Sequence, residues 1–143
     1  MNQFAAITRF TIPGPPQGKA RARTVRNCGF THSYTPEKTV LYENLVKTEY
    51  EQAGGIYHGG TVQISLKIVA YYPIRKGESK CNVACMLSGN TRPTKKPDIS
   101  NVLKIVEDAL NGVAYKDDAQ IVHNETDKFY GAVPRVEVEI REL

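Results

Sequence analysis

Acidic and basic side chains gather around one predicted helix in the last third of the chain. Asp98 opens an apolar-periodic segment that predicts a helix, and Lys104 and Asp108 recur on its polar face, with the pair Asp117-Asp118 a short distance beyond its end. Clustered carboxylates repel one another unless a cation lies between them. A hard divalent ion such as Mg²⁺ binds a few carboxylates together with water and phosphate oxygens. The pattern therefore indicates a metal site for phosphate chemistry, with Lys104 placed to stabilise negative charge.

Each part of this cluster also has a plainer interpretation. Asp98 is a suitable helix N-cap, Lys104 and Asp108 have the spacing of a surface ion pair, and Asp117-Asp118 is typical of a turn. Spacing alone leaves the metal site and this structural interpretation open.

A second set of residues predicts a nucleic-acid interface. Residues 1–97 hold 14 lysines and arginines against 5 acidic residues, whereas residues 98–143 hold 5 against 10. Cations that alternate along an extended backbone suit a phosphate track, and nearby Phe30 and Tyr34 could stack on a base. A solvated loop remains the alternative. The candidate DNA-binding cations are Lys19, Arg21, Arg23, Arg26, Lys95 and Lys96.

The elements that position these residues are predicted from periodicity. A short strand over 6–12 precedes a loop to Tyr34, and a helix begins near Thr35-Pro36 and stops at Gly54-Gly55. A strictly alternating strand follows over 61–72, then a short helix capped by Ser79, then the helix over 98–111. Two last strands joined by a short link predict a hairpin. The order β-α-β-(α)-α-β-β predicts one α+β (mixed α/β) domain over 1–143, with a partly antiparallel sheet.

Composition excludes several classes of protein. No run approaches the roughly 18 apolar residues of a membrane span, and the first residues lack the features of a signal peptide. The three cysteines, Cys28, Cys81 and Cys85, cannot all pair within one chain, which favours a reducing, cytoplasmic location. No glycine-rich phosphate loop or serine-hydrolase elbow is present.

Several motifs together resemble one family. They are Phe10-Thr11-Ile12-Pro13-Gly14-Pro15-Pro16, Lys19-x-Arg21-x-Arg23, Tyr34-Thr35-Pro36, Arg92-Pro93-Thr94-Lys95-Lys96-Pro97-Asp98, Asp108-Ala109-Leu110-Asn111-Gly112 and Tyr115-Lys116-Asp117-Asp118-Ala119-Gln120-Ile121-Val122. In this order they resemble the RusA family of Holliday-junction resolvases, the crossover-junction endodeoxyribonucleases of bacteria and prophages. The resemblance implies a homodimer that acts in DNA recombination and repair. The resemblance further implies that this homodimer binds four-way junction DNA and hydrolyses two opposing strands. The implied cofactor is Mg²⁺, for which Mn²⁺ can substitute.

The resemblance also implies roles for individual residues. Asp98 and Asp118 match catalytic, metal-binding aspartates, Asp117 stands beside the second, and Lys104 matches the essential lysine. The family motif Asp-x-Asp-Asn reads Asp-Ile-Ser-Asn here, so Ser100 replaces a catalytic aspartate. A serine hydroxyl brings no charge to a divalent ion.

This departure leaves several interpretations open. In the first, the chain is a natural variant that recruits Asp117, Glu107 or Asp108 in place of the missing aspartate. In the second, it is a dimer that binds junctions without cutting them. In the third, the serine is an introduced mutation. A third class, a phosphohydrolase of small nucleotides, is disfavoured because a small substrate needs no long cationic track.

Two further expectations concern shape. The prolines of Pro13–Gly18 predict a stiff protrusion that enters the opening of a junction. Val69 and Tyr71, on the second face of the alternating strand, predict a surface that packs against a second copy.

Overall fold

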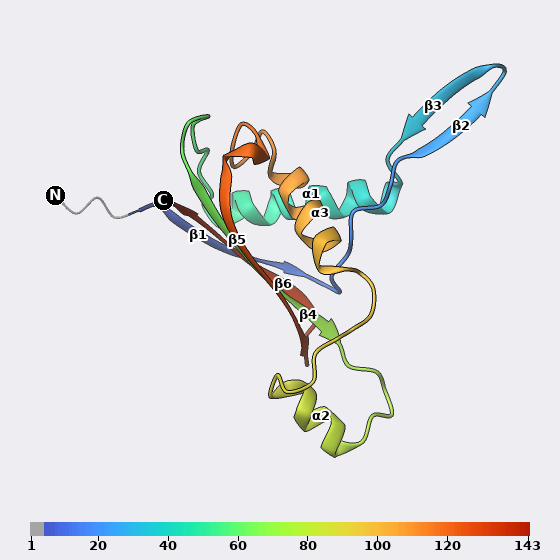
Figure 1. Cartoon of the computed structure of the whole chain (residues 1–143), viewed down its shortest axis with the longest axis vertical. Helices are drawn as coiled ribbons and strands as arrows, with labels where there is room; N and C mark the ends of the chain where they lie inside the picture. The colour runs from blue at the N-terminus through green and yellow to red at the C-terminus, as the bar shows by residue number, and fades with distance from the viewer. Residues whose placement is uncertain (1–4) are drawn as a thin grey trace.

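A mixed four-stranded sheet forms the centre of the computed structural model, which describes residues 5–143 (Figure 1). Its strands lie in the order β1-β6-β4-β5, where β6 is antiparallel to both neighbours and β4 is parallel to β5. The strands are β1 (Ile7–Pro13), β4 (Ile64–Pro73), β5 (Ile121–Gly131) and β6 (Arg135–Glu142). This arrangement confirms the predicted α+β class.

Helices cover one face of this sheet. They are α1 (Glu37–Gln52) and α3 (Ile99–Leu110), which pack against each other (Figure 1), while α2 (Lys80–Leu87) lies apart from them beyond one end of the sheet. A short 3-10 turn, η1 (Asp118–Gln120), leads into β5. A separate hairpin consists of β2 (Arg23–Asn27) and β3 (Phe30–Tyr34). No helix in the described part of the chain is both long and apolar enough to cross a bilayer.

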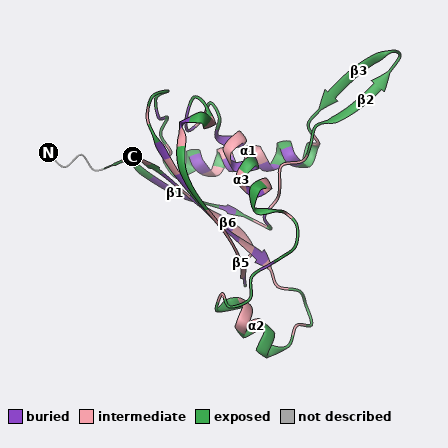
Figure 2. Cartoon of the chain, in the orientation of Figure 1, coloured by how far each residue is buried: buried purple, intermediate pink, exposed green. Residues whose placement is uncertain are grey.

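The core follows the predicted periodicities. Alternate residues of β4 from Ile64 to Tyr72 are fully buried, because one face of the strand packs under the helices (Figure 2). On α3 the buried stripe is Val102, Ile105, Val106, Ala109 and Leu110. Ile99, at the start of the helix, is apolar but 42% exposed. Ser79 caps α2 as predicted, since its hydroxyl accepts a hydrogen bond from the Asn82 amide at 3.2 Å.

The predicted hairpin of the last two strands is wrong. β5 and β6 are joined by a short link, but β4 lies between them and pairs with both. A strand whose inner face is entirely apolar is most stable at the centre of a sheet, where neighbours satisfy both of its edges. The link crosses the end of β4 beside Gly131, where any Cβ would lie 2.9 Å from that of Tyr71.

The expected loop up to Tyr34 is also partly wrong, because it contains the β2–β3 hairpin. All ten hairpin residues are exposed, so no alternation of apolar and polar residues announces the strands. The turn has positive φ at Cys28 and Gly29, which is the geometry of a two-residue hairpin turn. Asn27-Cys28-Gly29 was the available signal.

Candidate active site and nucleic-acid interface

Helix α3 and the turn η1 bring a lysine and two aspartates together. Lys104 Nζ lies 3.1 Å from Asp108 Oδ1 and 3.6 Å from Asp118 Oδ2. The hydrogen bond with Asp108 raises the pKa of Lys104, so this lysine stays cationic. Two of the predicted catalytic residues, Lys104 and Asp118, are therefore neighbours, although the plainer Lys104–Asp108 ion pair is present as well.

The backbone around Asp118 is fixed by the buried side chain of Gln120. Its amide nitrogen donates to the Gly59 carbonyl at 2.6 Å, and its amide oxygen accepts from the backbone of Lys116 at 2.9 Å and of Asp117 at 3.3 Å. Because the segment before β5 is tied in this way to the chain that enters β4, the Asp118 carboxylate is presented toward α3.

The carboxyl groups near Lys104 have pKa values that are shifted in different directions. A side-chain hydrogen bond with Asp117, together with partial burial, raises the pKa of Asp118, while the same bond lowers the pKa of Asp117. Burial and then the charge of Asp118 raise the pKa of Glu107. Such shifts are typical of a site where negative charge is concentrated and a cation is favoured.

A second lysine enters the site from the N-terminal basic segment. Lys19 Nζ lies 3.2 Å from Asp108 Oδ2 and 2.5 Å from Glu43 Oε1 on α1. Asp108 therefore bridges Lys19 and Lys104. Lys19, expected on a phosphate track, neutralises two acidic residues of this chain, and its contact with DNA stays a prediction. Glu43 was missed because nothing in the sequence links positions so far apart.

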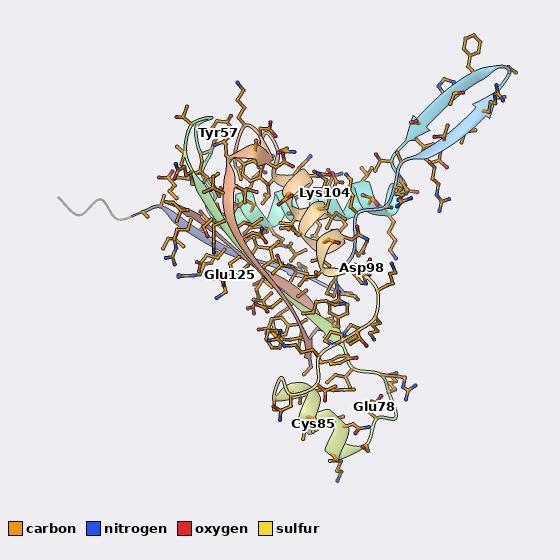
Figure 3. All side chains as sticks on the ribbon, in the orientation of Figure 1. Tyr57, Glu78, Cys85, Asp98, Lys104 and Glu125 are labelled. Atoms are coloured by element: carbon orange, nitrogen blue, oxygen red, sulfur yellow. The ribbon has the colours of Figure 1, made fainter. Side chains whose placement is uncertain are left out.

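Asp98 lies at the other end of α3 (Figure 3). Lys104 follows six positions later, about 9 Å along a helix axis. The Asp98 side chain makes no capping hydrogen bond, is about half exposed and pairs with Lys96 Nζ at 3.1 Å. Within residues 5–143 it forms no ion pair with Lys104. Its carboxylate is thus free of the helix amides and available to a ligand.

Two contacts from the sheet hold the segment that precedes Asp98. The Tyr72 hydroxyl donates to the Pro97 carbonyl at 2.6 Å, and Lys128 Nζ donates to the Lys95 carbonyl at 2.7 Å. Lys128 Nζ also lies 4.8 Å from the centre of the Tyr72 ring. Burial, and then the charge of Asp98, raise the pKa of Tyr72 to about 12, so its hydroxyl keeps the donated proton.

A groove of about 730 Å³ runs beside this segment and contains no acidic side chain. Lys96, Pro97 and Asn101 line one side. The remaining lining residues are Pro16, Gln17, Gly18, Lys19, Ala20, Arg21, Ala22, Arg23, Pro36, Lys38 and Thr39. The structure therefore brings four of the predicted DNA-binding cations, namely Lys19, Arg21, Arg23 and Lys96, to one concave surface that reaches the start of α3.

Arg26 and Lys95 lie outside this groove. Arg26 is on the exposed hairpin, paired with Thr31 across the strands. Lys95 Nζ lies 5.7 Å from the centre of the Tyr130 ring.

The predicted protrusion of Pro13–Gly18 is wrong. Pro16 is buried, and Gly18 approaches α3 so closely that a Cβ there would lie 3.0 Å from those of Asn101 and Pro97. The Lys19 amide then donates to the Asn101 carbonyl at 3.1 Å. The prolines stiffen a segment that packs against the body, and the element that projects is the β2–β3 hairpin.

The donor groups suit a hard cation bound by few protein ligands. Asp98 and Asp118 offer carboxylate oxygens, whereas Ser100, exposed in the first turn of α3, offers a neutral hydroxyl. In the described part of the chain, no three or more His, Cys, Asp or Glu side chains converge as a metal site. Mg²⁺ is commonly bound through one or two carboxylates plus water and substrate phosphates, so the residues present fit that ion.

Comparison with known proteins shows the family to which the chain belongs. The model of the family described as Endodeoxyribonuclease RusA matches residues 13–141, nearly the whole chain. The chain belongs to this RusA endodeoxyribonuclease family. It is also 37% identical, over 139 residues, to the Bacillus subtilis (strain 168) protein named "Uncharacterized protein YqaN", a match that covers 94% of this chain and 96% of that protein.

Proposed function

We propose that this chain is a divalent-metal-dependent endonuclease that resolves four-way DNA junctions. The observation that carries the proposal is the placement of an acid-free basic groove against the start of α3, the helix that also bears Lys104 beside Asp118. A polyanion seated in the groove reaches Asp98 directly, because Lys96 and Pro97 belong to the groove wall. Family membership supports DNA as that polyanion.

The roles of the residues follow from their charges. Asp98 and Asp118 would hold Mg²⁺, or Mn²⁺ in its place, which when bound supplies an activated water and neutralises phosphate charge. Lys104 keeps its proton and is placed to stabilise the negative charge that develops on the phosphoryl oxygens during hydrolysis. Asp117 caps the turn η1 that carries Asp118, because its Oδ1 accepts a hydrogen bond from the Ala119 amide at 3.4 Å.

Paired cleavage of a junction requires two active sites related by a two-fold axis, so we extend the proposal to a homodimer. The candidate interface is the sheet face opposite the helices, where Val69 and Tyr71 line a shallow cavity of about 530 Å³. Its other lining residues include the charged side chains of Arg9, Lys67, Glu137 and Glu139. A dimeric mass in light scattering at micromolar concentration is expected, and a monomeric mass would contradict paired incision.

The cytoplasm is the proposed location. Cys28, Cys81 and Cys85 are all free thiols in the structure, which is compatible with a reducing compartment.

Cleavage of a labelled four-way junction with Mg²⁺ or Mn²⁺ tests the proposal. Paired nicks are expected from the unmodified chain. They should be lost in Asp98→Asn and in Asp118→Asn, with DNA binding kept or tightened because each change removes negative charge near phosphates. Glu125→Gln is the control, since this exposed acidic residue lies on β5 outside the site (Figure 3).

One observation favours a second function, a dimer that binds junctions without cutting them. Ser100 leaves the site one carboxylate short of the family motif, and no three acidic side chains converge within the described residues. A junction that is shifted in a gel but remains uncut would support this alternative. Turnover of nucleotides with neither binding nor nicking of DNA would instead indicate a small-molecule phosphohydrolase.

A further inference from the structure

The β2–β3 hairpin projects from the body as an isolated element (Figures 1 and 2). Within residues 5–143 its strands pair with each other and with no other strand, and every residue from Arg23 to Asn27 and from Phe30 to Tyr34 is exposed. A two-stranded hairpin without a supporting layer is only marginally stable in water. A partner surface that covers it would therefore stabilise it.

The two faces of the hairpin differ in chemistry. Residues opposite each other share a face, and the pairs on the first face are Arg23 with Tyr34, Val25 with His32, and Asn27 with Phe30. The second face holds the polar pairs Thr24 with Ser33 and Arg26 with Thr31, and the hydroxyl oxygens of Thr24 and Ser33 lie 3.5 Å apart. Phe30 is 70% exposed and Tyr34 is 47% exposed. The first face is thus an uncovered aromatic face, here defined by Phe30, His32 and Tyr34.

The charge around this aromatic face selects its partner. The first acidic residue of the chain is Glu37, so no carboxylate precedes or lies within the hairpin. Arg21, Arg23 and Arg26 lie on it or just before it. An apolar protein surface would leave these guanidinium groups without counterions, whereas nucleic acid offers phosphates to the arginines and flat bases to the rings.

The spacing of the aromatic face matches that of stacked bases. Alternate residues of a strand lie about 7 Å apart, and consecutive bases in DNA stack about 3.4 Å apart. One base therefore fits between two neighbouring side chains of the series Phe30, His32 and Tyr34. We infer that this face of the hairpin binds bases that are unstacked at the branch point of a junction, while the groove holds the backbone of an arm.

The branch point is favoured over the arms by the cost of unstacking. Bases within a duplex arm are paired and stacked on both sides, and opening them costs energy. Bases already freed from continuous stacking are bound at less cost. The inference rests on the proposed function, because it assigns the part of the chain that distinguishes a junction from duplex DNA.

The test compares affinities for a four-way junction and for duplex DNA of the same arm sequence, with 2-aminopurine placed at the branch. Phe30→Ala should reduce the preference for the junction over the duplex by roughly 5- to 150-fold, as for loss of one base-stacking aromatic. Quenching of branch-point 2-aminopurine, a signature of a base stacked on a ring, should weaken with it. Phe30→Trp should retain both properties.

Tyr57→Ala is the matched control, because Tyr57 is an exposed aromatic residue on the segment between α1 and β4, away from the hairpin (Figure 3). It should leave the preference and the fluorescence unchanged. Thermal unfolding of all variants should be unaltered, since neither side chain is buried.

Three outcomes would overturn the inference. An unchanged preference in Phe30→Ala excludes the hairpin as the reader of the branch. An equal loss of affinity for junction and duplex would show that the hairpin contacts DNA without distinguishing the branch point. A shift in the monomer–dimer equilibrium of Phe30→Ala without DNA assigns the face to a second copy. Failure of the unmodified chain to bind any junction would instead contradict the proposed function, and is seen before any variant is made.

Discussion

At the scale of single residues, Ser100 has the strongest bearing on activity. It stands at the second position of α3, two residues after Asp98, and is exposed. Aspartate is well tolerated in the first turn of a helix, where the macrodipole stabilises negative charge. The serine is therefore no requirement of folding, and its effect falls on the chemistry of the site.

Ser100→Asp should raise junction cleavage at least about tenfold at saturating Mg²⁺, because it restores a charged oxygen ligand. The free energy of unfolding should stay constant or rise by about 0.3–1 kcal/mol from the macrodipole. Single-turnover cleavage and urea unfolding measure the two effects. Ser100→Asn, which has similar size and no charge, is the control. A rate that is unchanged or lower would mean that the hydroxyl is a working part of a differently arranged site.

The sequence singled out candidate site residues, but it did not indicate the contacts that those residues make. Asp98, Lys104 and Asp118 stand in recognisable motifs, so their positions were accessible. The Lys19–Glu43 and Lys128–Lys95 contacts join residues more than twenty positions apart. Such contacts depend on how the elements pack, which periodicity does not report.

At the scale of elements, β5 links the two halves of the site. Its first residues follow Asp118, and Lys128, further along the same strand, holds the Lys95 carbonyl in front of α3. The segment that delivers Asp98 is thus anchored to the sheet at two carbonyls, those of Lys95 and Pro97.

Lys128→Met should loosen this segment and leave the rest of the fold intact. We expect faster amide hydrogen exchange over residues 95–99 and a several-fold lower cleavage rate, with the affinity for DNA unchanged, because Lys128 acts through the backbone. Lys128→Arg should restore protection, and Lys80→Met on α2 serves as the control for loss of a surface cation. If Lys128→Met weakens the salt dependence of DNA binding, Lys128 contacts phosphate directly and the positioning role is wrong.

The edge strand β1 is tied to β6 by an ion pair whose strength depends on pH. Arg9 Nε lies 2.7 Å from Glu139 Oε2, and this hydrogen bond lowers the pKa of Glu139. A depressed carboxyl pKa adds stability above the unfolded-state value near 4.5, and that stability disappears as the pH falls through the folded-state value.

Glu139→Gln should therefore lower the free energy of unfolding at pH 7 by about 0.5 kcal/mol, a small value because Arg9 is solvent-exposed. The difference from the unmodified chain should shrink steadily as the pH is lowered below 4. Urea unfolding at a series of pH values measures it, with Glu125→Gln as the control. A difference that persists at low pH would indicate a packing effect instead of an ion pair.

The same strands show where periodicity stops being informative. The alternation predicted a strand over 61–72 with the buried face that β4 (Ile64–Pro73) shows, but it did not predict the place of β4 between β5 and β6. A short link between two strands usually makes a hairpin. Here β4 lies between the linked strands, because its apolar inner face is more stable with a hydrogen-bonded neighbour on each side. The β2–β3 hairpin was not predicted, because none of its residues is buried and its sequence therefore shows no alternation of apolar and polar residues.

At the scale of the whole molecule, the basic and acidic residues lie in different parts of the sequence but next to each other in the fold. The basic groove draws on residues 16–39 and on Lys96, and it meets the acidic site where Gly18 and Lys19 pack on α3. A phosphate backbone attracted to the groove is thereby brought next to carboxylates that would otherwise repel it. The basic groove and the acidic site thus form one continuous surface for a phosphate backbone.

The salt dependence of binding tests this surface separately from catalysis. Each phosphate contact releases counterions, so the logarithm of affinity falls with the logarithm of salt concentration by about 0.9 per contact. Arg21→Ala combined with Arg23→Ala should make that slope shallower by about two per protomer and weaken binding to all sequences alike. Lys47→Ala removes a cation from α1, away from the groove, and should leave the slope nearly constant. An unchanged slope in the arginine variant would mean that Arg21 and Arg23 face solvent or a second copy, and the phosphate track would then lie in residues 74–97.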